Sequence, residues 1–170
     1  MKKVLLLFAF VIGFSQVHAQ QIYSADFAGS SGVGFTHDSS NPPASGPAVS
    51  NGSNFDLGYM TTPATDGSAN FFRVDATNSF IESEDFGGEA FFSSVTIDVS
   101  TANEVMISAT GNTVGSSVFN AAGEVFEYSY TLDGGIPVTF FSTMSDGSLN
   151  AMETVDVTGI NSMTIGFRFD

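Results

Sequence analysis

The stretch VFEYSYTLDGG at residues 125–135 gives the strongest indication of fold class in this chain. From residue 126 to residue 132, every second residue is large and apolar, and the residues between them are polar. This two-residue period predicts a β-strand with one buried face and one polar face. Asp133, Gly134 and Gly135 tolerate the positive φ of a tight turn, and residues 138–142 supply a returning strand. The stretch therefore predicts a β-hairpin.

The same period recurs on both sides of the hairpin. Residues 95–99 and 104–109 alternate around a short polar link, and we expect them to form two neighbouring antiparallel strands. Residues 163–169 alternate again, after a turn at residues 146–148. Weaker strand patterns occur at residues 22–27, 55–60, 70–76 and 79–82.

These patterns predict an all-β fold in one domain that covers residues 20–170. Residues 29–53 are rich in Gly, Ser, Asn and Pro, and we expect them to form a long surface loop. About nine to eleven short strands separated by turns are typical of two packed antiparallel sheets. We therefore expect an antiparallel β-sandwich of jelly-roll type.

Residues 1–19 have the three parts of a secretory signal peptide. Lys2 and Lys3 give a positive start, residues 4–14 are apolar, and a short polar tail ends at Ala19. We expect cleavage between Ala19 and Gln20, followed by export. The apolar run has eleven residues, whereas a membrane-spanning helix needs about 20. No second run of this kind follows, so we expect no transmembrane segment in the mature chain.

The charge of the mature chain is strongly negative. All 18 Asp and Glu follow residue 19, and the loss of Lys2 and Lys3 with the signal changes the net charge from −14 to −16. Only Arg73 and Arg168 remain as cations, so the chain lacks the Lys and Arg clusters that bind phosphate backbones. We therefore expect no nucleic-acid binding. Acidity of this kind favours solubility outside the cell, or the binding of a hard cation such as calcium.

The inventory of reactive side chains is short. The chain has no Cys, and the mature part has no Lys and a single histidine, His37. A nucleophile and base pair or a zinc site needs more of these groups. Catalysis by two carboxylates remains open, because Glu82, Glu84 and Glu89 lie in one acidic stretch. Gly87 and Gly88 interrupt this stretch and the chain has no Trp, which favours an acidic turn between strands.

Two kinds of binding site are compatible with the remaining residues. Glu84, Asp85 and Glu89 could converge on a calcium ion if the glycine pair between them bends the chain tightly. Sugar rings could stack on an exposed aromatic face instead. The tyrosines are Tyr23, Tyr59, Tyr128 and Tyr130, of which the last two share the apolar face of their strand and are expected in the core.

Three stretches carry a resemblance to a known family: IYSADF at residues 22–27, DFGGEAFFSS at 85–94, and FNAAGE at 119–124 leading into YSYTLDGG at 128–135. They resemble the N-terminal β-sandwich modules of large exported Bacteroidota proteins that use the type IX secretion route. The resemblance implies a jelly-roll fold, an extracellular or cell-surface location, and adhesion or glycan contact. It implies no catalytic residues.

Such proteins end in a C-terminal sorting domain, which residues 136–170 do not contain. We therefore expect a piece of a longer protein, or a domain whose last strand is an open edge that pairs with another chain.

The sequence as a whole predicts a non-catalytic extracellular module that attaches to a glycan or a cell-surface polymer. Two alternatives stay open: a structural domain that self-associates through an exposed edge strand, and a carbohydrate-active enzyme that uses carboxylates.

Overall fold

The computed structural model describes residues 20–24, 34–37, 49–50, 55–59, 70–75, 80–84, 89–113 and 124–169. Within these ranges the backbone forms strands, turns and loops, without a helix, and none of these residues builds a helix able to cross a membrane. The described strands are β1 (Gly34–His37), β2 (Val49–Ser50), β3 (Phe55–Tyr59), β4 (Asn70–Asp75), β5 (Phe80–Glu84), β6 (Ala90–Ser94), β7 (Ile97–Asp98), β8 (Glu104–Ala109), β9 (Phe126–Leu132), β10 (Val138–Thr143), β11 (Ala151–Asp156) and β12 (Ser162–Phe169).

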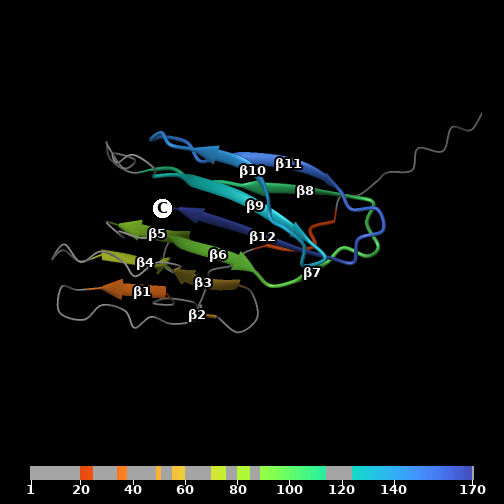
Figure 1. The fold of residues 1–170 in the computed structure, drawn as a ribbon, viewed down its shortest axis with the longest axis horizontal. Coiled ribbons are helices and arrows are strands. Elements are labelled where there is room, and N and C mark those ends of the chain that lie inside the picture. The colour runs from red at the N-terminus through yellow and green to blue at the C-terminus, as the bar shows by residue number, and fades with distance from the viewer. Residues whose placement is uncertain are drawn as a thin grey trace, which may run out of the picture.

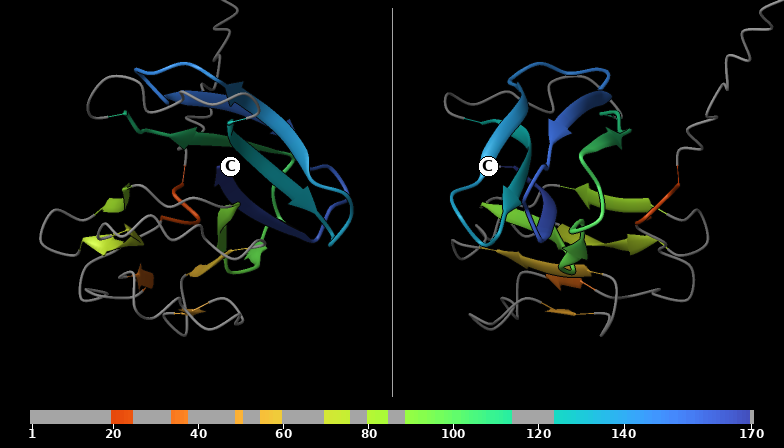
Figure 2. Two further views of the ribbon diagram at one scale, coloured as in Figure 1. Left: turned by 60° about the vertical axis from the view of Figure 1, so that its left-hand side comes forward. Right: turned by 90° about the vertical axis from the view of Figure 1, so that its right-hand side faces the viewer.

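The strands form three antiparallel sheets (Figure 1). The large sheet has the order β10-β9-β12-β6-β3-β2, with β7 also paired to β12. A three-stranded sheet has the order β1-β4-β5. Among the described residues, the third sheet consists of β11 and β8. The three-stranded sheet lies on the side of β6 and β3, away from β10 and β11 (Figure 2).

The β8–β11 pair packs face to face on the large sheet. A buried cluster lies between the two layers and draws residues from both, namely Ile97, Val99, Ile107, Val155, Val157 and Met163. A second cluster continues the core along β9 and consists of Phe126, Tyr128 and Leu149. Because packed sheets bury one face of each strand, this arrangement gives a sandwich-like all-β fold.

The hairpin predicted at residues 125–142 is confirmed. β9 pairs with β10, and the turn between them has positive φ at Asp133 (47°) and Gly134 (68°). The N–H of Gly135 donates to the carbonyl of Leu132 at 2.9 Å and closes the turn. Two successive positive φ values match the right-handed twist of the strands they join.

The expected pairing of residues 95–99 with 104–109 is wrong. β7 pairs with β12, and β8 pairs with β11 along its whole length. The chain crosses between layers instead, so that Ile97 and Ile107 meet in one buried cluster. Alternation predicts which face of a strand is buried, but not which strand lies beside it.

Several other boundaries differ from the expectation. The range 29–53, expected as a loop, contains β1 and β2; β1 pairs with β4 and β2 with β3. The rest of that range lies outside the described residues, as do residues 25–27. Residues 22–24 are not in a strand. The sequence patterns predict neither β6 nor β11, and the described strands number twelve.

The final strand is not an edge strand, which corrects the expectation from the sequence. β12 lies inside the large sheet, between β9 on one side and β6 and β7 on the other (Figure 1). The alternating residues of β12 are apolar on the face toward the core, where Met163 is fully buried. A strand paired on both sides offers no free edge to another chain.

Candidate functional site

The large sheet has an outer face that points away from the core. Successive side chains of a strand point to opposite faces, so the residues between the buried ones of β6, β9 and β12 share this face. The strand register arranges them in three rows across the sheet. The rows are Phe91–Arg168–Glu127, Ser93–Gly166–Ser129 and Thr164–Thr131.

An ion-pair bridge spans the first row. Nε of Arg168 donates to Oε2 of Glu127 at 2.6 Å, and Nη1 of Arg168 donates to Oε1 of Glu89 at 2.5 Å. These hydrogen bonds raise the pKa of Arg168, and the bond to Glu127 makes the largest contribution. The bridge connects β9, β12 and the residue that precedes β6. Because the Arg168 side chain is 46% exposed, we expect the bridge to stabilise the fold only modestly.

Gly166 keeps the middle row flat. A Cβ at this position would lie 2.8 Å from the carbonyl oxygen of Phe92, which is backbone and cannot move aside. Ser93 and Ser129 are the register partners of Gly166 on the two neighbouring strands. The sheet therefore presents a shallow strip, without a side chain at its centre, between two small hydroxyl side chains.

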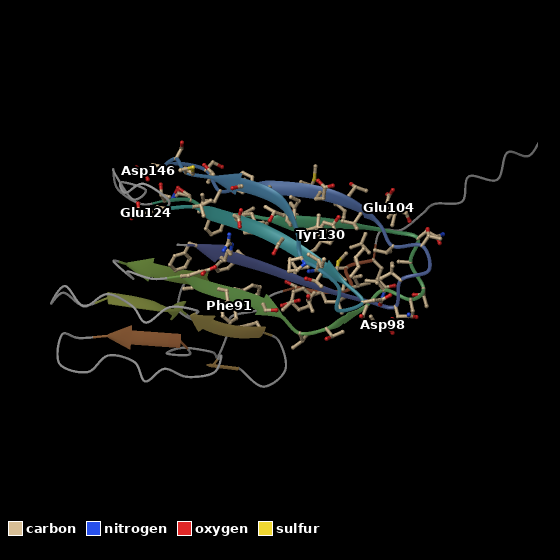
Figure 3. The ribbon with its side chains drawn as sticks, viewed as in Figure 1. Phe91, Asp98, Glu104, Glu124, Tyr130 and Asp146 are labelled. Carbon is tan, nitrogen blue, oxygen red and sulfur yellow. The ribbon has the colours of Figure 1, made fainter. Side chains whose placement is uncertain are left out.

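The other groups of the outer face suit hydrogen bonding and ring stacking. Thr131 and Thr164 face each other in the register, and each hydroxyl both donates and accepts. Phe91, labelled in Figure 3, is partly exposed on β6 and is the register partner of Arg168. A partly exposed aromatic ring beside hydroxyls and charged groups can bind a ligand that has both apolar and polar faces.

The structure places the predicted acidic residues in β5, at the residue before β6, and in a stretch outside the described residues. Glu82 and Glu84 belong to β5 of the three-stranded sheet, opposite Arg73 and Phe71. Glu89 is bound to Arg168, and Asp85 lies outside the described residues. Among the residues that the structure describes, no three His, Cys, Asp or Glu side chains are grouped as metal ligands. The calcium site at Glu84, Asp85 and Glu89 stays a prediction.

The tyrosines are placed as follows. Tyr128 is buried and Tyr130 is half-buried against the core, which confirms that both belong to the inner face. Burial raises the pKa of Tyr128 to about 12. Tyr23 packs against the core cluster between the layers, and burial raises its pKa as well. Tyr59 lies in β3.

Neither His37 nor Gln20 belongs to β6, β9 or β12. His37 ends β1 and is the register partner of Asn70. Gln20 is exposed, whereas Ala19 lies outside the described residues.

The bridge on the outer face is not predicted by the sequence. The sequence points to Glu89 only as a ligand or an acid in a turn, and to Arg168 only as one of two remaining cations. A signal was available, because Glu127 and Arg168 both occupy outward positions of strongly alternating strands. What the sequence lacks is the information that these two strands are neighbours.

No protein-family model, curated protein or solved structure matches this chain. The protein is defined by its own fold and surface: antiparallel sheets packed in layers, with a polar, shallow outer face on the larger one.

Proposed function

We propose that the protein is an exported β-sandwich module of jelly-roll type that attaches to a glycan or a cell-surface polymer and performs no reaction on it. The attachment surface is the outer face of the large sheet. The observation that carries the proposal is the row arrangement on β6, β9 and β12, which places Phe91 beside a flat strip of hydroxyl groups.

The surface supports attachment because its geometry is set by the sheet. Each group sits on β6, β9 or β12, and each of these strands is paired on both sides. Binding therefore needs little loss of conformational entropy in the protein. Hydroxyl groups match the hydroxyl groups of sugars as donors and acceptors. A partly exposed ring offers the apolar contact that a sugar ring needs.

Export is part of the proposal and rests on the signal-like residues 1–19 with cleavage before Gln20. The strong negative charge fits a protein that must stay soluble at an extracellular surface. The resemblance to exported Bacteroidota modules points to the same location.

The experiment is a glycan array probed with mature protein, with and without calcium. We expect binding that falls about tenfold in Phe91→Ala and also weakens in Thr164→Ala. Thr154→Ala is the matched control, because Thr154 is an exposed threonine on β11 in the other layer. Thermal unfolding of all three variants shows that each is folded. Absence of binding to every glycan, in both conditions, contradicts the proposal.

One observation favours a second function, self-association through an edge. Among the described strands β10 is hydrogen-bonded to β9 alone. Exposed apolar side chains lie at this edge: Val138 is 45% exposed and Ile136, in the preceding turn, 87%. An open edge with apolar residues can pair with a second copy. Sedimentation of the wild type and of Val138→Lys tests this, since an edge-paired dimer would dissociate in the variant.

A further inference from the structure

We infer that the ligand of the outer face is an uncharged polysaccharide. The inference rests on the proposed function and adds the chemical class of the polymer. Three observations on the described residues carry it: the pairing of Arg168 with two carboxylates, the sign of the charge around it, and the uncharged row beside it.

Arg168 is already engaged by protein carboxylates. Guanidinium groups recognise carboxylate and sulfate groups by donating two parallel hydrogen bonds. In this structure Nε donates to Glu127 and Nη1 donates to Glu89. An acidic sugar that binds through Nε and Nη1 would have to displace these carboxylates, and one that approaches the rest of the guanidinium lies beside both of them.

The charge at the bridge is negative after this pairing. One guanidinium faces two carboxylates within 2.6 Å, so an approaching anion meets an excess of negative charge. Arg73, the one other cation of residues 20–170, belongs to β4 of the three-stranded sheet. A net charge of −16 after loss of Lys2 and Lys3, against −14 for the full sequence, adds long-range repulsion of any anionic polymer.

The three residues of the strip beside the bridge are uncharged, and Asp56 of β3 is the register partner of Ser93 at one end of it. Neighbouring strands are about 4.8 Å apart, so the row Ser93–Gly166–Ser129 spans about 10 Å across the sheet. Thr131 and Thr164 continue the hydroxyl surface by one further row. Neutral sugars carry hydroxyl groups and no formal charge, so they satisfy this strip without a buried or unpaired charge.

The test is affinity electrophoresis of the mature protein in gels that contain a defined polymer. The uncharged polymers are dextran, mannan and laminarin, and the anionic ones are alginate and dextran sulfate. We expect at least one uncharged polymer to retard the protein to the same extent at about 0.15 M and about 1 M salt, because uncharged contacts are not screened. We expect no retardation by the anionic polymers, and an about tenfold weaker retardation of Phe91→Ala.

A gain-of-binding variant tests the role assigned to Arg168. Glu89→Gln combined with Glu127→Gln keeps the side-chain shapes and removes the two negative charges beside the guanidinium. We expect this double variant to acquire weak retardation by alginate that disappears at high salt, while Thr154→Ala behaves as the wild type. A folded double variant that gains nothing contradicts the role assigned to the two carboxylates.

The outcomes separate this inference from the function on which it rests. Retardation of the wild type by an anionic polymer, without retardation by any neutral one, overturns the inference and leaves polymer attachment standing. No retardation by any polymer overturns both.

Discussion

At the scale of single residues, Ser94 shows how a polar group is accommodated in the core. Its side chain is buried, 4% exposed, at the point where the partner of β12 changes from β6 to β7. The Oγ of Ser94 accepts a hydrogen bond from the backbone N–H of Ile165 at 2.9 Å and donates to the carbonyl of Val95 at 2.8 Å. The Ser94 hydroxyl thus takes the place of the backbone carbonyl that would otherwise accept the Ile165 N–H in the sheet.

Ser94→Ala removes this replacement and leaves the Ile165 N–H without its acceptor. We expect the free energy of unfolding to fall by about 2 kcal/mol, because an unsatisfied buried donor costs its desolvation. Urea unfolding measures the loss. The control is Ser93→Ala on the outer face, whose hydroxyl makes only a 3.3 Å contact with the carbonyl of Ser94; a change below about 0.5 kcal/mol is expected there. Equal losses in the two variants would contradict this assignment.

Tyr128 predicts how stability changes at alkaline pH. Burial raises the pKa of Tyr128 from 10.0 to about 12 in the folded protein. Between these values the unfolded chain loses the proton first, so stability is retained below pH 10 and falls as the pH rises toward 12. We expect Tyr128→Phe to show a smaller alkaline loss than the wild type in urea unfolding at a series of pH values. Parallel curves for the two proteins would contradict the prediction.

At the scale of elements, β8 shows how a short strand holds two layers together. Ile107 is 3% exposed in the core cluster between the layers, whereas its neighbour Met106 is 63% exposed on the opposite face. Alternation along one strand therefore decides which side chain contributes to layer packing.

The pair Ile107→Ala and Met106→Ala tests the layered arrangement. We expect Ile107→Ala to lower the free energy of unfolding by about 3 kcal/mol, since truncation of a buried side chain loses transfer energy and leaves a cavity. Met106→Ala should change it by less than about 0.5 kcal/mol. The midpoint of chemical unfolding reports both. A comparable cost at Met106 would show that the other face of β8 is covered.

At the scale of the whole molecule, the charges are divided unevenly along the chain. The acidic residues all follow residue 19, and two of the four cationic Lys and Arg residues precede it. Removal of residues 1–19 would therefore make the remaining chain more negative, −16 against −14.

Processing is tested by the intact mass of the exported protein. We expect a chain that begins at Gln20 and lacks Lys2 and Lys3. Ala19→Asp should leave the precursor uncut, because small residues are required at the cleavage site. Gln21→Ala, beyond the cut, should be processed normally. A mature protein that still contains residues 1–19 would contradict the prediction.

Local alternation is enough to establish the fold class and the inner face of the best strands. A two-residue period depends only on the local geometry of an extended backbone. The hairpin of β9 and β10 and the core positions Tyr128 and Met163 therefore follow from the amino-acid order alone. The pattern fails where strands are short or weakly alternating, as in β1, β2 and β11. The assumption that strands adjacent in the chain are also adjacent in space is false for β7 and β8.

The order of the strands within each sheet, and with it the candidate site, depends on the three-dimensional packing. The ion-pair bridge joins Arg168 to Glu127, which lies 41 positions earlier in the chain, and to Glu89, which lies 79 positions earlier. The central position of β12 likewise depends on its partner strands on both sides. Strand order is set by the packing of whole layers, a long-range balance that no local period records.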